Sequence, residues 1–378
     1  MGSSQRGGKT TEVPAMVKVL VVDDSPVVRE FLVHILSADP GIHVVAAVSD
    51  GEEALASVQR TRPHVVTMDI HMPKMDGLEA TRGIMESHPT PIVIVSGSST
   101  VNEATMAFRA MEAGALAVVR RPTGLGHPDH EATAAELVQA VKLMAEVKVV
   151  RRWPRAHRGT MVSPIARAGG EEPERLPEEF SLVAIGASTG GPLVLQRILS
   201  ALAQGFPLPV LIVQHMSPGF LDGFAEWLGH SSGFPVRVAR QGELILSGHA
   251  YVAPDGFHME VGSRDRITLS HGEPENGLRP SVSCLFRSVA RVYGEQAVGV
   301  LLTGMGKDGA EELRQMKEKG AVTIAQDEES CVVYGMPGEA VRLDAATYVL
   351  SPEKIAGALT SLVNNQARKN HQRGRVAP

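Results

Sequence analysis

The 378-residue chain has few cysteines, little net charge and no long apolar run, and each shortage excludes a class of protein. Neither of its two cysteines, Cys284 and Cys331, has the spacing of metal ligands, so we expect no disulfide framework and no zinc site. A net charge of −5 gives no basis for bulk attraction to nucleic acid or membranes. Without a transmembrane-length run or a secretory signal, we expect a cytoplasmic protein with no membrane insertion.

The length and the composition predict a globular protein of about two domains. Two regions that alternate apolar runs with helical patterns are separated by a stretch rich in proline, glycine and charge, which indicates a tether. We therefore predict a disordered leader at 1–16, a first domain at 17–145, a linker at 146–179, a second domain at 180–365, and a basic disordered tail at 366–378.

The first domain has the pattern of a parallel sheet covered by helices. Its short strands are apolar throughout, which is typical of strands buried on both faces. Strands are predicted at 18–24, 43–49, 64–70, 91–96 and 116–121, and helices at 26–36, 52–60, 78–87, 102–114 and 131–149.

Polar residues gather at the ends of these strands, where parallel sheets bind ligands. They are Asp23, Asp24, Asp69, Ser96 and Arg121. Three carboxylates in one crevice repel one another unless a cation bridges them, and an all-oxygen ligand set favours Mg²⁺ beside a phosphoryl group. Asp69 would then be the nucleophile that forms an aspartyl phosphate, and Ser96 would donate to a phosphoryl oxygen. The alternative is that the aspartates are solvated loop ends.

The segments 21–26 (VVDDSP), 67–73 (TMDIHMP), 75–77 (MDG) and 95–97 (VSG) resemble the receiver domain of bacterial response regulators. The resemblance implies a flavodoxin-like fold of five strands and five helices. It also implies Mg²⁺ at Asp23, Asp24 and Asp69, and phosphorylation of Asp69 by a partner histidine kinase. The family usually has lysine where this chain has Arg121, a wider and planar cation that can still pair with a phosphoryl group.

The second domain is also predicted to be α/β, doubly wound around a mostly parallel sheet, with a β-hairpin added. Strands are predicted at 180–187, 208–214, 235–240, 297–303 and 321–325, and the hairpin region at 250–272. Helices are predicted at 193–202, 220–228, 281–293, 310–319 and 353–363.

Three polar residues each follow the end of an apolar strand in this domain: Ser188, His215 and Asp308. A serine becomes a nucleophile when a histidine takes its proton, and a carboxylate fixes the imidazole and stabilises its charged form. The chain order differs from that of the α/β-hydrolases, although 186–190 (GASTG) matches their nucleophile pattern. Two other interpretations of this glycine-rich turn stay open, a phosphate cradle and a simple turn.

The segments 185–192 (IGASTGGP), 214–220 (QHMSPGF), 279–282 (RPSV), 302–310 (LTGMGKDGA) and 326–337 (QDEESCVVYGMP) resemble the catalytic domain of the chemotaxis protein-glutamate methylesterases (CheB). The order of the two domains also matches. One departure is Ser283, where the family often has aspartate, and we expect it to affect contacts with substrate and not the triad.

This resemblance implies hydrolysis of glutamate methyl esters and deamidation of glutamines on chemoreceptors, catalysed by Ser188, His215 and Asp308. A backbone group at Thr189 is a candidate for holding the oxyanion, and Met305 is a second candidate, for a backbone or a substrate contact. No cofactor is expected for the esterase reaction. The expected partners are methylated cytoplasmic domains of chemoreceptors and a histidine kinase, with no nucleic acid, and the chain is expected to be a monomer. The alternatives are an esterase of the same family in another sensory pathway, and a phosphorylation-gated module that binds a phosphate or nucleotide.

Overall fold

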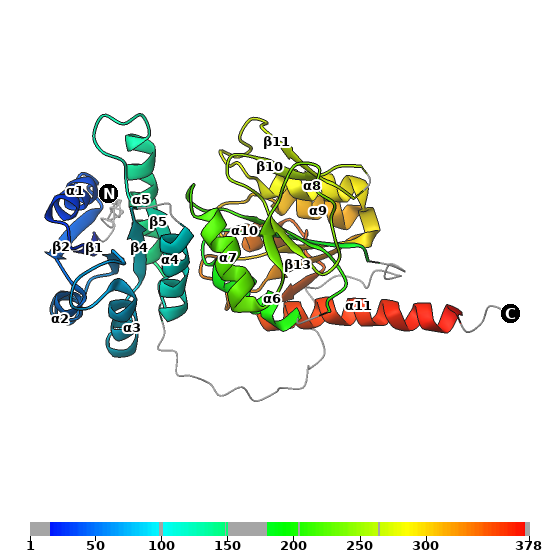
Figure 1. The fold of residues 1–378 in the computed structure, drawn as a ribbon, viewed down its shortest axis with the longest axis horizontal. Coiled ribbons are helices and arrows are strands. Elements are labelled where there is room, and N and C mark those ends of the chain that lie inside the picture. The colour runs from blue at the N-terminus through cyan, green and yellow to red at the C-terminus, as the bar shows by residue number, and fades with distance from the viewer. Residues whose placement is uncertain are drawn as a thin grey trace, which may run out of the picture. The chain divides into compact units, whose positions relative to one another are not determined.

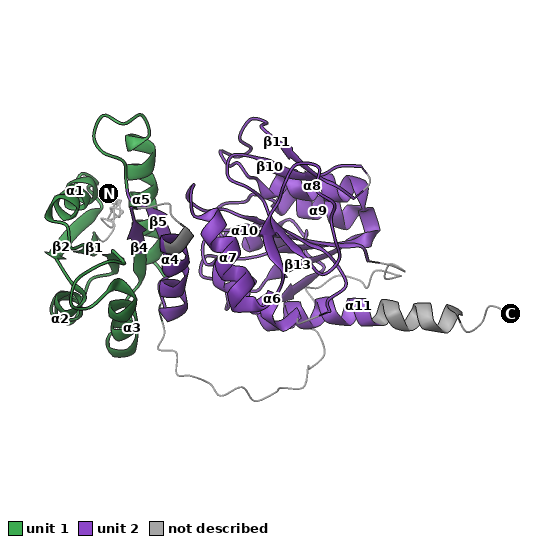
Figure 2. Ribbon diagram, in the orientation of Figure 1, with its two compact units in different colours: residues 1–93, 122–149 green, residues 94–121, 150–378 purple. Residues whose placement is uncertain are grey.

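The computed structural model describes residues 16–97, 101–147, 149, 180–202, 205–263 and 265–374 (Figure 1). The chain forms two compact units, residues 1–93 with 122–149 and residues 94–121 with 150–378 (Figure 2). Residues 1–15 of the expected leader and 150–179 of the expected linker lie outside the described residues. In the described part of the chain, no helix is both long enough and apolar enough to span a membrane.

A five-stranded sheet in the order β2-β1-β3-β4-β5 forms from the first half of the chain. Strand β1 pairs in parallel with both β2 and β3, and all four residues of β3 are buried. The strands are β1 (Val17–Val22), β2 (Ile42–Val48), β3 (Val65–Met68), β4 (Ile92–Ser96) and β5 (Ala117–Arg120). This alternation of strands and helices confirms the predicted receiver fold. Most of β4, and all of α4 and β5, fall in the second compact unit.

The helices of this half are α1 (Pro26–Ser37), α2 (Gly51–Thr61), α3 (Gly77–Ser87), α4 (Val101–Ala113) and α5 (His130–Ala145). Local sequence sets where several of them begin. The side chains of Asp50 and Asp76 accept hydrogen bonds from backbone N–H groups in the first turns of α2 and α3, and Ser25 does the same for α1. Such caps satisfy N–H groups that have no partner within the helix.

The second half forms a seven-stranded sheet in the order β14-β13-β12-β6-β7-β9-β8, and every neighbouring pair is parallel. Its strands are β6 (Leu182–Ala187), β7 (Val210–Gln214), β8 (Val236–Val238), β9 (Ala250–Val252), β12 (Ala297–Leu301), β13 (Val322–Gln326) and β14 (Tyr348–Leu350). A separate antiparallel hairpin joins β10 (His258–Val261) to β11 (Ile267–Ser270). The fold is therefore the expected doubly wound domain with a hairpin.

Helices cover this sheet in two groups. One group is α6 (Gly191–Leu202), α7 (Leu221–Ser232) and α11 (Pro352–Gly374), and the other is α8 (Val282–Val292), α9 (Ala310–Glu318) and α10 (Met336–Arg342). Alternate residues of β6 and β7 (Leu182, Ala184, Leu211 and Val213) share one buried cluster with residues of α8, α9 and α10. Because side chains alternate across a strand, the remaining buried residues of β6 and β7 lie on the opposite face.

Three details differ from the sequence predictions. Strand β9 belongs to the main parallel sheet, whereas its residues were expected in the hairpin, because it pairs with β7 and β8. The short elements α10 and β14 were not predicted. Helix α11 extends to Gly374, so residues 366–374, which were expected in a disordered tail, are helical in the structure. Good helix formers such as Gln, Ala, Arg and Lys fill that stretch, with neither glycine nor proline before Gly374.

Candidate functional site

Ser188 lies on a tight turn between β6 and α6. Its backbone N–H donates to the carbonyl of Thr303 at 3.0 Å, and its own carbonyl accepts from the N–H of Gly191 at 2.8 Å. Gly190 has φ of +80°, a conformation that L side chains rarely adopt, and a Cβ there would lie 2.6 Å from a methyl group of Val332. The turn is therefore held from both sides, with the serine at its apex.

His215 follows directly after β7, the neighbour of β6. Its backbone N–H donates to the carbonyl of Ala187 at 3.0 Å, one residue before Ser188. Its imidazole is mostly buried, with 9% of the side-chain surface exposed. The sheet thus carries the serine and the histidine at adjacent strand ends.

Asp308 lies in the loop after β12, the other neighbour of β6, and is buried. Its Oδ2 atom is 3.0 Å from His215 Nε2 and accepts from the N–H of Val282 at 2.6 Å. Its Oδ1 atom accepts from Ser281 Oγ at 2.8 Å and from the N–H of Ser283 at 3.2 Å. The carboxylate therefore sits at the N-terminus of α8, where the helix dipole favours negative charge.

These hydrogen bonds decide the charge of Asp308. Burial by itself would raise the pKa of its carboxyl group, but the hydrogen bond and the charge of His215, with the hydrogen bonds of Ser281 and Ser283, lower this pKa to about 2. At neutral pH the group is therefore an ionised acceptor facing the imidazole. That is the state needed to orient a histidine base and to stabilise its imidazolium form.

The three predicted residues thus meet at one edge of the sheet, on β6 and its two neighbours. Among the described residues, the hydrogen bond of the His215 ring goes to Asp308, and none joins this ring to the hydroxyl of Ser188. Catalytic hydrogen bonds commonly tighten only when substrate is bound.

The two oxyanion candidates lie on either side of Ser188. Thr189 follows it in the turn, and its carbonyl accepts a hydrogen bond from Thr303 Oγ1 at 2.9 Å. Met305 follows Gly304, where an added Cβ would lie 2.6 Å from Ser188 Cβ, so the loop backbone passes directly against the serine. The Met305 side chain is 43% exposed, which leaves it accessible from solvent.

Sequence reasoning missed several supporting residues. Ser281 caps α8 and donates to Asp308, and Gln214 bonds to the backbone of both Ser188 and His215. A serine at a helix start and a glutamine at the end of an apolar strand were the available signals. Ser283 is buried, its backbone N–H donates to Asp308, and its hydroxyl donates to Glu312.

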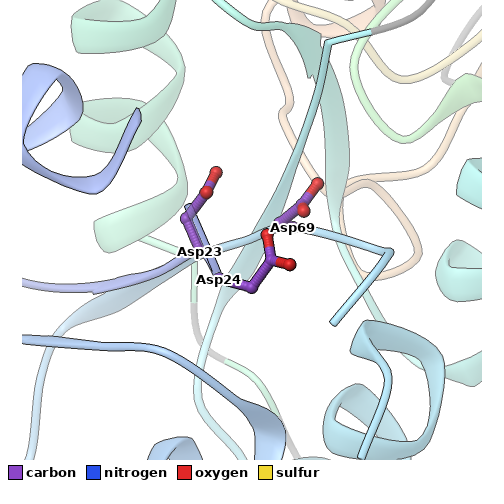
Figure 3. A group of neighbouring side chains, drawn as sticks. All are labelled: Asp23, Asp24 and Asp69. Carbon is purple, nitrogen blue, oxygen red and sulfur yellow. The ribbon is translucent and has the colours of Figure 1, made fainter. Parts of the chain in front are cut away.

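A second cluster of functional side chains lies in the first unit, where Asp23 and Asp24 follow β1 and Asp69 follows β3 (Figure 3). One carboxylate oxygen from each lies within 4.8 Å of the others. Asp23 and Asp69 are buried, whereas Asp24 is exposed. An all-carboxylate set that opens to solvent on one side fits Mg²⁺, which keeps several waters in its coordination shell.

Ser96 and Arg121, predicted to contact a phosphoryl group, lie at the ends of β4 and β5. Ser96 is buried, and its hydroxyl donates to Glu103 of α4 at 3.4 Å, while its carbonyl accepts from the N–H of Arg121 at 2.8 Å. The Arg121 guanidinium lies against Gly97, where an added Cβ would be 2.8 Å from Nη1. The arginine is thus packed beside the serine.

Comparison with known proteins gives a family match for each half of the chain. Residues 19–127 match the response regulator receiver domain, and residues 183–359 match CheB methylesterase. A protein-glutamate methylesterase/protein-glutamine glutaminase of Nitrosospira multiformis is 59% identical over 92% of this chain and 97% of its own length. The chain belongs to this methylesterase family.

Two further similarities are to a second methylesterase and to a solved catalytic domain. A protein-glutamate methylesterase/protein-glutamine glutaminase of Geobacter metallireducens is 58% identical over 92% of this chain and 99% of its own length. The crystal structure of the Thermotoga maritima CheB methylesterase catalytic domain is 37% identical, covers 49% of this chain and 99% of that one, and has a TM-score of 0.48. The predicted family is confirmed. The receiver-domain match spans the aspartate cluster, and the CheB methylesterase match spans the Ser188 site.

Proposed function

We propose that this methylesterase hydrolyses glutamate methyl esters on the cytoplasmic domains of chemoreceptors, with release of methanol, and deamidates selected glutamines there. The observation that carries the proposal is the hydrogen bond between His215 and the ionised Asp308 beside the Ser188 turn. The names of the relatives, which share most of the chain length, support the choice of substrate.

The first step is acylation of the serine. His215 Nε2 faces Asp308, so Nδ1 is the ring nitrogen left to accept the Ser188 proton. As Oγ attacks the ester carbonyl, a tetrahedral oxyanion forms and the imidazole becomes imidazolium, which Asp308 stabilises. Collapse of this intermediate transfers the proton from His215 to the methoxy oxygen, so methanol leaves and an acyl-enzyme remains.

The second step is hydrolysis of the acyl-enzyme. His215 takes a proton from water, the hydroxide attacks the acyl carbonyl, and Ser188 leaves with that proton restored. In deamidation the same sequence releases ammonia in place of methanol. Backbone N–H groups of the Ser188 turn at Thr189, and of the adjoining loop at Met305, are the proposed oxyanion donors. Such donors are worth about 10²–10³-fold in kcat.

We infer that the aspartate cluster receives a phosphoryl group on Asp69 from a histidine kinase. Asp23, Asp24 and Asp69 would hold Mg²⁺, which neutralises phosphoryl charge when it is bound. Ser96 supplies a hydroxyl and Arg121 a cation at the ends of the next two strands of the sheet. For Ser96 to donate to a phosphoryl oxygen, its hydrogen bond to Glu103 has to break.

Control of the esterase by this phosphorylation is proposed to pass through α4. Within the second unit, the ring of Phe108 on α4 lies 5.3 Å from the rings of Phe224 and Trp227 on α7, and Trp227 Nε1 donates to Glu112. The N–H of Arg120 also donates to Ser217, two residues after His215. A modification shifts an equilibrium between two conformations only if it stabilises one of them more than the other. Phosphorylation would therefore stabilise a conformation in which α4 no longer packs against α7.

The deciding experiment measures methanol release from a methylated receptor, with and without a small-molecule phosphodonor. Wild-type protein is expected to release methanol faster with the phosphodonor. Ser188→Ala is expected to release none above background while it keeps its fold and its phosphorylation. Full activity in Ser188→Ala would overturn the triad. Labelling of Ser188 by a sulfonyl fluoride, dependent on His215, tests the nucleophile without any receptor.

The α4 hypothesis has its own test. Phe108→Ala is expected to raise turnover without phosphodonor. The ratio of turnover with phosphodonor to turnover without it should therefore be smaller than in wild type. Phe31→Ala is the matched control, since Phe31 packs against His130 in the first unit. Phe31→Ala is expected to keep the wild-type stimulation. If Phe108→Ala keeps it as well, the contact of α4 with α7 does not control the esterase.

A further inference from the structure

Gln214, the last residue of β7, joins the two main reacting residues through its side chain. Its amide Nε2 donates to the carbonyl of Ser188 at 2.8 Å and to the carbonyl of His215 at 2.8 Å. The residue is 3% exposed. Ser188 and His215 follow different strands, so one buried amide group spans the gap between the proposed nucleophile and its base.

The two carbonyls fix the orientation of this amide. A flipped amide would place Oε1 against two carbonyl oxygens, which is repulsive, so the NH₂ group must face them. Oε1 then points to the start of α6 and finds no donor among the described residues. A Cβ at Gly191 would lie 2.2 Å from Oε1, so only glycine at this position leaves room for the glutamine.

The hydrogen bonds of Gln214 are not required to satisfy the Ser188 carbonyl. That carbonyl already accepts from the N–H of Gly191 at 2.8 Å. A buried amide that leaves one oxygen unpaired costs about 1–3 kcal/mol, and a purely structural residue of similar shape, such as methionine or leucine, would avoid that cost. The arrangement therefore favours a role in geometry over a role in stability.

We propose that Gln214 is a positioning residue, which sets the separation and angle of the Ser188 hydroxyl and the His215 imidazole by holding the backbone of both. The proposal rests on the proposed serine mechanism. Displacement of reacting groups by about 1 Å can cost on the order of 10²-fold in rate. The effect is expected on kcat, because the Gln214 side chain is buried and bonds to the backbone of Ser188 and His215, not to their reacting atoms.

The test is Gln214→Met in the full-length protein, since methionine keeps the length and bulk but has no amide donors. We expect kcat for methyl ester hydrolysis to fall about 10–100-fold with KM within about threefold of wild type. Labelling of Ser188 by a sulfonyl fluoride should slow by a similar factor. A kcat within threefold of wild type in folded protein would overturn the proposal.

Thr323→Val is the matched control for stability. Thr323 is a buried residue of β13 that bonds to Thr347, so the substitution removes buried hydrogen bonds from the same sheet. It is expected to lower Tm, because buried hydrogen bonds are lost, yet to leave kcat and the labelling rate unchanged. An equal fall of kcat in both variants would mean that Gln214 acts only through stability.

A second background separates positioning from other effects. In His215→Gln, where the base is gone, adding Gln214→Met should cause no further loss of the residual turnover. A further loss of tenfold or more would show that Gln214 acts independently of His215 and would refute the proposal. Failure of the proposed function would look different: wild-type protein would release no methanol, while Ser188 labelling would still report the effect of Gln214.

Discussion

Asp308 and Ser281 are joined by a hydrogen bond of 2.8 Å that ties the triad carboxylate to the first residue before α8. The same carboxylate contacts His215 through its other oxygen. The histidine is therefore oriented by a helix terminus as well as by a side chain, and the proposed catalysis depends on contacts that also stabilise the second unit.

Asp308→Asn should reduce both catalysis and stability at neutral pH. An amide cannot stabilise the imidazolium form and can favour the wrong tautomer, so kcat is expected to fall by about 10⁴-fold. Steady-state methanol release measures this loss. A variant with more than a tenth of wild-type kcat would contradict the assigned role.

The loss of unfolding free energy caused by Asp308→Asn should depend on pH. Because the pKa of Asp308 is lowered from 3.8 to about 2 in the folded protein, its ionised form contributes about 2 kcal/mol above pH 4. That contribution is lost as the pH falls through the folded pKa. Urea unfolding of wild type and Asp308→Asn should therefore show a gap at pH 7 that narrows from pH 4 toward pH 2. A constant gap would exclude a depressed pKa.

Ser281→Ala should weaken the helix cap and the support of Asp308 together. Loss of a capping serine typically costs about 1 kcal/mol, which denaturant unfolding would detect. One of four hydrogen bonds to Asp308 is also removed, so kcat should fall several-fold. Ser281→Thr keeps the hydroxyl and should restore most of both quantities. If threonine rescues neither, the hydroxyl is not the group that matters.

Gly304→Ala should displace the Ser188 turn. A Cβ at this position would lie 2.6 Å from Ser188 Cβ and 2.5 Å from Met336 Sδ, closer than atoms can approach. We expect at least a 100-fold loss of kcat and slower sulfonyl fluoride labelling. Gly357→Ala is the control, because no atom outside the adjoining turns of α11 lies within 4 Å of a Cβ added there. Near wild-type labelling of Gly304→Ala would mean that the loop can yield without moving the serine.

Asp69→Asn should separate phosphorylation from hydrolysis. The amide cannot accept a phosphoryl group, so incorporation of labelled phosphate and the stimulation of methanol release should both vanish. Turnover without phosphodonor should stay at the wild-type level. Chelation of Mg²⁺ by EDTA should likewise prevent phosphorylation of the wild type. Phosphate incorporation in Asp69→Asn would place the acceptor elsewhere.

Sequence reasoning predicted most strands of both sheets because parallel strands are apolar throughout, a strong local pattern. It also named Ser188, His215 and Asp308, since each follows the end of such a strand. It assigned β9 to the hairpin and missed β14, two strands of three residues each. Segments that short carry too little periodicity, so their pairing depends on neighbours far away in the chain.

By itself the sequence determined the fold class, the family motifs and the residue types able to do the chemistry, because these follow from local patterns of apolar and polar residues. Only the tertiary structure decided which groups support them. The order β12-β6-β7 brings three strand ends together, places Asp308 at the start of α8, and lets Gln214 reach the backbone of Ser188. These contacts join residues that are 26 positions apart in the chain, and a local sequence pattern does not show which distant residues lie close together in space.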